Sequence, residues 1–327
     1  MIDFRYHLVS LIAVFLAVAL GIVVGTTQLN GPILDDLERQ VSALEQDKRS
    51  LEDETRTLQG QLDTTEEFAE AVAPALVEGT LTDRSVLLVL ASEEVATDDV
   101  EQVGSLIRQG GGTVAGQISL APAYSDPSTE SSLQSYVTGS GLPAGITLPE
   151  VDDAGQLVGS LLAQVLLVPP ADPAAETPAD PAPGPAPDPA AASSVLAGLA
   201  ALDVLRTDSD SVAPADLVVV LTAGEFTGAN ADDRNETLIE LVTALDDRGS
   251  GVVVAGDAAS AREGGLIGAL RDDPELASTI STVDNVGTAA GQASTVLALR
   301  AEAADSSGAY GTGEDTQPVP PVGADAP

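Results

Sequence analysis

Residues 85–90 read SVLLVL, a continuous apolar run of strand length. A helical pattern with an acidic start follows at 98–108, and three glycines at 110–112 end it. A second apolar stretch at 114–120 then predicts another strand. Because these strands are apolar throughout, both faces of their sheet must be covered by helices. The pattern predicts an α/β fold with a mostly parallel doubly wound sheet.

The second half of the chain repeats this alternation. We expect strands at 217–221, 252–255 and 280–283, and helices at 232–248 and 291–300. The α/β domain is therefore expected to cover residues 80–300. A segment rich in Pro and Ala at 169–192 predicts a surface insertion, although a boundary between two small domains gives the same composition. The segment 301–327 is rich in Gly, Asp and Pro and is expected to be disordered.

Before the domain, residues 31–73 carry a heptad repeat. Gly31-Pro32 is expected to open a new helix, because proline is tolerated in the first turn. The seam positions are Leu34, Leu37, Val41, Leu44, Lys48, Leu51, Thr55, Leu58 and Leu62, continued by Thr65, Ala69 and Val72. A single amphipathic helix packed on the domain is the alternative, but about 40 residues make a rod of about 60 Å, longer than such a domain can cover. The repeat favours a coiled-coil stalk and a parallel homodimer.

Residues 1–30 are expected to form an N-terminal tail and a transmembrane anchor. The run 8–24 is apolar or small except for Ser10, and its length of about 17 residues is at the short end of what spans a bilayer. A cleaved signal peptide is the alternative, but the apolar run continues beyond its expected cleavage site at 17–19. Small residues recur on one helix face and favour pairing of two anchors: Ala13, Ala17, Gly21 and Gly25. Arg5 weakly favours a cytoplasmic N-terminus, with the bulk of the chain extracytoplasmic.

The composition excludes several function classes. The chain has 13 Lys and Arg against 51 Asp and Glu, so nucleic acid would be repelled. It has no cysteine, and its single histidine and methionine are His7 and Met1. No Walker loop, GxGxxG motif or GxSxG elbow follows a predicted strand. We therefore expect no enzyme activity, no cofactor and no resident metal.

Carboxylates and amides follow several predicted strands, at the edge where open α/β sheets bind ligands. The expected strand-end site consists of Glu225, Asp257, Asp284 and Asn285. Their oxygen atoms suit a hard cation. The alternative, which the pattern favours, is that they cap the helices that follow.

The N-terminal stretch MIDFRYHLVSLIAVFLAVALGIVVG (1–25) closely resembles the opening of the actinobacterial copper transporter family of MctB type. GEF at 224–226 and STVDNV at 281–286, with Gly291 and the helix at 296–299, also look like that family. The resemblance implies a cell-envelope protein of copper homeostasis, with an outer-membrane location proposed for the family. Its corynebacterial SteB-like branch implies a role in envelope integrity and cell separation, with a SteA-like membrane protein as partner.

Two functions remain open from the sequence. The first is a dimeric membrane-anchored scaffold whose stalk holds an acidic head away from the bilayer. The second is a component of copper transport or efflux that conducts copper or shapes a pore. Copper prefers Met, His and Cys donors, which this chain lacks beyond residue 7, so the sequence favours the scaffold.

Overall fold

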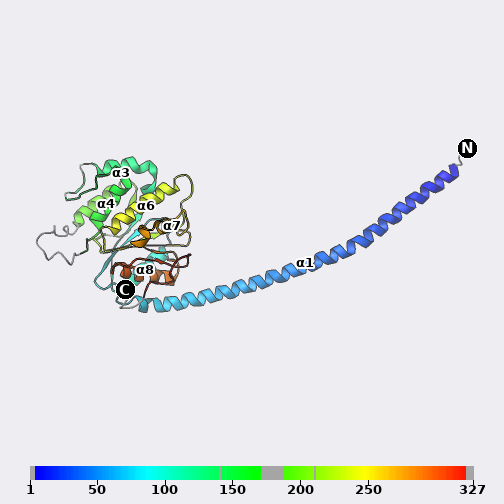
Figure 1. Cartoon of the computed structure of the whole chain (residues 1–327), viewed down its shortest axis with the longest axis horizontal. Coiled ribbons are helices and arrows are strands. Elements are labelled where there is room, and N and C mark those ends of the chain that lie inside the picture. Colours follow the sequence, from blue (N-terminus) through cyan, green and yellow to red (C-terminus); the bar gives the residue numbers. More distant parts are fainter. Residues whose placement is uncertain (1–3, 140, 144, 171–187, 210, 322–327) are drawn as a thin grey trace. The chain divides into compact units, whose positions relative to one another are not determined.

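A computed structural model describes residues 4–321 except 140, 144, 171–187 and 210, and gives the backbone alone for residues 4, 26–36 and 38. By contact density the chain divides into two compact units, Met1–Thr65 and Glu66–Pro327. Helix α1 (Phe4–Val77) makes up the described part of the first unit and contributes its last turns to the second. Figure 1 shows the elements of both units.

The anchor region of α1 is one candidate membrane span. Arg5–Gly25 is 21 residues long, apolar enough to cross a bilayer, and exposed along its whole length. The helix continues through Gly31-Pro32, so the expected new start at that point is wrong. Proline lacks one N–H and its ring crowds the carbonyl of the preceding turn, so the helix passes through Pro32 at the loss of one backbone hydrogen bond and with some steric strain.

Further along α1, the apolar seam side chains are exposed on this chain. The exposed fraction is 74% for Leu44 and 63% for Leu51. Polar seam positions bond within the helix: the Lys48 ammonium lies 3.5 Å from Glu52, and the Thr55 hydroxyl donates to the Leu51 carbonyl at 2.7 Å. The Leu34 side chain lies outside the described residues.

The second unit is built on a seven-stranded sheet. Its order is β3-β2-β1-β4-β5-β6-β7, and every neighbouring pair is parallel except β2 and β3. This confirms the predicted mixed α/β fold with a mostly parallel sheet. The strands are β1 (Ser85–Leu90), β2 (Thr113–Leu120), β3 (Leu205–Thr207), β4 (Leu217–Thr222), β5 (Val252–Gly256), β6 (Ser281–Val283) and β7 (Ala309–Tyr310).

Two apolar clusters lie on opposite faces of this sheet. Successive residues of β1 point to opposite faces, so Leu87 and Val89 belong to one cluster and Val86 and Leu88 to the other. The first cluster is covered by α3 (Glu130–Val137), α4 (Ala154–Leu166), α5 (Pro189–Ala200), α6 (Ala231–Asp246) and α7 (Leu266–Asp272). The second is covered by α2 (Thr97–Gln109), α8 (Ala289–Glu302) and the last turns of α1. Figure 1 shows α4 and α6 on one side of the sheet and α8 on the other.

The Pro/Ala-rich segment lies mostly outside the described residues. The elements that flank it, α4 and α5, pack into the same apolar cluster. Both sides of the segment therefore belong to one core.

The expected disorder of 301–327 is wrong for the described part of that segment. β7 pairs with β6, and Tyr310 is 2% exposed. The Tyr310 carbonyl accepts hydrogen bonds from the Asp284 amide at 3.2 Å and from Arg271 at 3.1 Å. These contacts bind a polar segment to the sheet edge, and residues 322–327 lie outside the described residues.

Candidate functional site

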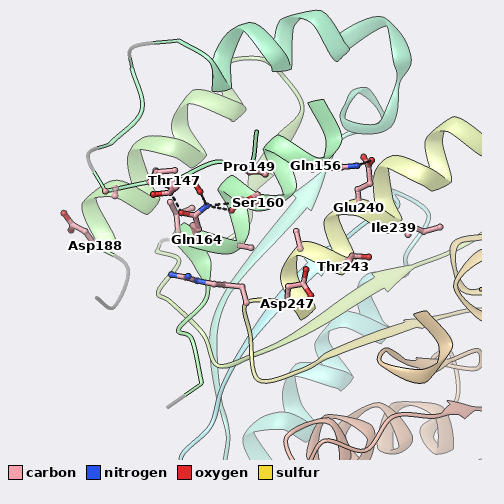
Figure 2. A pocket seen from close by; sticks show the side chains of 17 residues that line it. Thr147, Pro149, Gln156, Ser160, Gln164, Asp188, Ile239, Glu240, Thr243 and Asp247 are labelled. Atoms are coloured by element: carbon pink, nitrogen blue, oxygen red, sulfur yellow. Dashed lines mark hydrogen bonds between the residues drawn. The ribbon is translucent and has the colours of Figure 1, made fainter. Parts of the chain in front are cut away.

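A groove of about 860 Å³ lies along the packed helices α4 and α6. Gln156, Ser160 and Gln164 line it from α4, and Glu240 and Thr243 from α6 (Figure 2). The loop at 145–149, which carries little regular structure of its own, forms a further wall, and the start of α5 and the residues that follow α6 complete the lining.

Gln164 fixes this loop on α4. Its side-chain oxygen accepts from the Thr147 amide at 3.0 Å, and its amide nitrogen donates to the Thr147 carbonyl at 2.8 Å (Figure 2). The two bonds satisfy both backbone groups of Thr147, much as a neighbouring strand would. The groove wall is thereby held in place by one side chain.

Among the acids that line the groove, Glu240 has the most strongly shifted pKa. It is half-buried on α6, and its Oε1 accepts a hydrogen bond from the side-chain amide of Gln156 at 3.2 Å (Figure 2). Burial raises the pKa of Glu240 to about 7; the Gln156 hydrogen bond opposes the rise, and the nearby Asp153 charge adds to it. A Cβ at Gly155 would collide with Glu240 Oε2, so the carboxylate occupies space that this glycine leaves open at the start of α4.

The start of α4 explains the position of Asp153. Its carboxylate caps the helix by accepting a hydrogen bond from the backbone amide of Gln156 at 3.0 Å. The helix cap therefore fixes Asp153 at a position from which its charge acts on Glu240. Together with Tyr124 they also line a second, smaller cavity of about 210 Å³.

The expected strand-end site divides into two places. Glu225, after β4, lies 3.5 Å from Arg262 and lines a third cavity of about 310 Å³ beyond β1 and β4. Asp257, after β5, accepts from the amides of Gly224 at 3.0 Å and Ser260 at 2.9 Å. Asp257 thus holds two turns in place.

Asp284 and Asn285 lie after β6. Asp284 is 1% exposed and pairs with Arg271 at 2.8 Å. Burial favours the neutral form of Asp284, but hydrogen bonds from the Thr312 amide and from Arg271 outweigh it and hold the pKa below its ordinary value. Asn285 donates to the Thr288 hydroxyl at 3.3 Å, next to the start of α8. Asp257 therefore accepts hydrogen bonds from backbone amides, and Asp284 accepts them from backbone amides and from Arg271.

Within the described part of the chain, no three His, Cys, Asp or Glu side chains are placed to hold one metal ion. The anchor-face residues Ala13, Ala17, Gly21 and Gly25 recur along α1, and a Cβ added at Gly21 or Gly25 would meet open space.

Sequence reasoning missed the residues around Glu240. Asp153 before an apolar run was a readable helix-cap signal. Glu240 and Tyr124 carry no such signal, because their partners are distant in sequence.

Comparison with known proteins gives a consistent result along nearly the whole chain. A family model described as "Copper transport outer membrane protein, MctB" matches residues 1–321. The protein named copper transporter MctB of Mycobacterium tuberculosis is 31% identical over 301 residues, covering 91% of this chain and 92% of the relative. The protein of that name from Mycobacterium leprae is 31% identical over 318 residues, with the same coverage.

Proposed function

Because the chain belongs to the MctB family, we propose that it is a single-pass envelope protein that works as a dimeric, membrane-anchored scaffold. The names of its relatives support a copper-related role in the cell envelope. In this proposal α1 forms the anchor and a coiled-coil stalk, and the doubly wound head is non-catalytic and engages a second envelope protein, such as a SteA-like membrane protein. The N-terminus faces the cytoplasm and the bulk of the chain is extracytoplasmic.

The exposed seam of α1 is the observation that carries this proposal. Large apolar side chains recur along the seam at spacings of three, four or seven residues, and more than half of each is exposed: Leu37, Val41, Leu44, Leu51, Leu58 and Leu62. Full burial of such a side chain contributes about 1.5–3 kcal/mol. A second copy in parallel register would bury the whole row at once, with like positions facing each other.

The positions beside the seam modulate this association. Glu45, Asp47, Glu52 and Glu54 flank it, and no basic residue occupies these flanking positions between residues 38 and 66. Two copies side by side would therefore bring acids together, while Lys48 sits between them in the seam. The apolar seam should outweigh this repulsion, since exposed charge pairs contribute at most about 1 kcal/mol each.

Copper conduction is the second candidate, and it rests on the names of the relatives. The donors of this chain argue against it: beyond residue 7 the sequence offers copper no imidazole, thiol or thioether. Calorimetric titration of the full chain with Cu(I) and with Cu(II) separates the two functions. Submicromolar binding would favour a conduit over a scaffold.

Disulfide crosslinking tests the dimer directly, because the chain has no cysteine of its own. Leu44→Cys places a thiol in the seam, and Gln46→Cys places the matched control on the outer face of the same helix turn. Under mild oxidation in membranes, we expect a covalent dimer from Leu44→Cys and little from Gln46→Cys. Equal crosslinking of the two variants, or none from either, would refute the parallel stalk.

A further inference from the structure

The smaller cavity beside Glu240 is unusually acidic. It lies among the 3-10 turn η1 (Pro122–Ser125), the start of α4 and the outer face of α6, and we refer to it as the acidic cavity. Six carboxylates line it: Asp126, Glu130, Asp153, Asp233, Glu236 and Glu240. No Lys or Arg is among its lining residues.

A buried hydroxyl without a partner lies in the wall of this cavity. Tyr124 is 2% exposed, and within the described ranges its hydroxyl makes no hydrogen bond. Burial, and after it the charge of Glu240, raises the pKa of Tyr124, so this carboxylate lies within electrostatic reach of the ring. A buried polar atom left unpaired costs free energy that a bound ligand can recover.

Hydrogen bonds from Ser128 and the charge of Arg234 hold the pKa of Asp126 low, whereas the charges that act on Glu240 are those of two acids, Asp153 and Glu236. Gly155 leaves space for Glu240 beside the start of α4, and the charge of Asp153 disfavours ionisation of Glu240. One carboxylate oxygen of Asp126 already accepts a hydrogen bond from the Ser128 backbone amide at 2.8 Å. Glu240 and Asp153 line the same cavity as Tyr124, and a positive charge bound there would relieve the repulsion between the two acids.

The arrangement of the acids and the size of the cavity favour an organic cation over a metal ion. No three carboxylates in the described structure converge closely enough for a metal ion. The cavity, at about 210 Å³, is larger than a single ion needs. Dispersed acids with a hydroxyl acceptor suit a cation whose charge is spread over several N–H donors on a carbon stem.

We infer that the acidic cavity binds an organic cation, the alkylammonium or guanidinium end of a lysine-like or arginine-like group. Its N–H groups donate to Glu240 and Asp153 and to the Tyr124 hydroxyl oxygen. Its stem lies against the apolar edge of Leu133, which also lines the cavity. The source is either a free polyamine or a basic side chain of a partner protein, and the inference does not depend on the dimer.

Calorimetry on the full chain in detergent micelles tests this inference, with spermidine and acetyl-arginine amide as probes. We expect at least one probe to bind at low salt, and Tyr124→Phe and Glu240→Gln each to weaken it about tenfold, as loss of a hydrogen bond to a charged group does. Glu101→Gln, an exposed acid on α2, is the matched control and should leave binding unchanged. Tighter binding of spermidine indicates a free polyamine, and tighter binding of the arginine probe indicates a protein side chain.

Folding is monitored separately, because Tyr124 is buried. Tyr124→Phe keeps the ring, so an unchanged melting temperature with weakened binding assigns the effect to the hydroxyl. The inference is overturned if neither probe binds at millimolar concentration, or if both variants bind as well as the original chain. Calcium binding that displaces the probes and depends on the same two residues would replace it with a metal site.

Discussion

Helices α1 and α4 both carry leucines at helical spacing, yet the two sets lie in opposite environments. Leu161 on α4 is fully buried between the sheet and α6, whereas Leu44 on α1 is 74% exposed. The head buries its apolar residues against its own strands, and the stalk has a comparable stripe that its own chain leaves uncovered. Under the proposed dimer, the head can be stable as one copy, while the stalk gains its stability from association.

Charges placed in the stalk seam should break this comparison most strongly. In the double variant Leu44→Glu and Leu51→Glu, two apolar contacts are lost and four carboxylates would be buried in the dimer. We expect the association free energy to fall by more than about 4 kcal/mol, which removes the dimer at micromolar concentration. Sedimentation of the full chain in detergent measures it, and an unchanged dimer would contradict the stalk. The melting of the head should stay the same.

A substitution in the core of the head should affect the head and leave the stalk unchanged. Leu161→Ala removes a fully buried side chain and leaves a cavity, which should lower the free energy of unfolding by about 2–5 kcal/mol. Urea denaturation followed by circular dichroism reports it. Crosslinking through Leu44→Cys should be unaffected in the same background. A loss of both properties together would show that head and stalk are not independent.

Titration should separate the buried acids of the head from the exposed acids of the stalk. Glu302 is 5% exposed, and burial raises its pKa to about 7, with hydrogen bonds from Ser281 opposing the rise and Asp246 adding to it. The folded chain therefore keeps this proton up to about pH 7, whereas the unfolded chain loses it near its ordinary value of 4.5. Stability from Glu302 is complete below 4.5 and is lost as the pH rises toward 7.

We expect Glu302→Gln to flatten this dependence, with a gain of about 2–3 kcal/mol at pH 7.5 relative to the original chain. Thermal melts between pH 4.5 and 7.5 measure it. Glu101→Gln is the exposed control and should follow the original curve. Identical slopes for Glu302→Gln and the original chain would contradict the assignment.

Salt should produce the smallest effect, confined to the stalk. Acids beside the seam repel across two copies, and screening them should strengthen the dimer by up to about 1 kcal/mol, or about fivefold in the dissociation constant. Sedimentation at low and high sodium chloride compares the two. A dimer that weakens in salt would indicate that attractive ion pairs hold it.

The pattern of the sequence predicted much of the sheet. SVLLVL at 85–90 became β1, and the apolar stretches near 217 and 252 became β4 and β5, because a run of large apolar residues has few stable positions other than a covered strand. The edge strands β3 and β7 were not predicted. They are three and two residues long, too short for an apolar run or an alternation to be recognised in the sequence.

Much less of the candidate site could be predicted from the sequence. Of the predicted strand-end residues, Glu225 lines a cavity, while Asp257 and Asp284 hold turns of the protein itself. Glu240 was not predicted, because its contact with Gln156 joins residues 84 positions apart, and a single acid within a helix is most often a solvated one.

The sequence by itself determined the family, the apolar N-terminal helix, the heptad of α1 and the mostly parallel α/β sheet, since each depends on local composition and on a period that repeats along the chain. The tertiary structure alone decided which carboxylates are solvated and which are crowded. The reason is physical: the environment of Glu240, Glu302 or Asp284 is set by neighbours from distant segments, and burial and charge act through space.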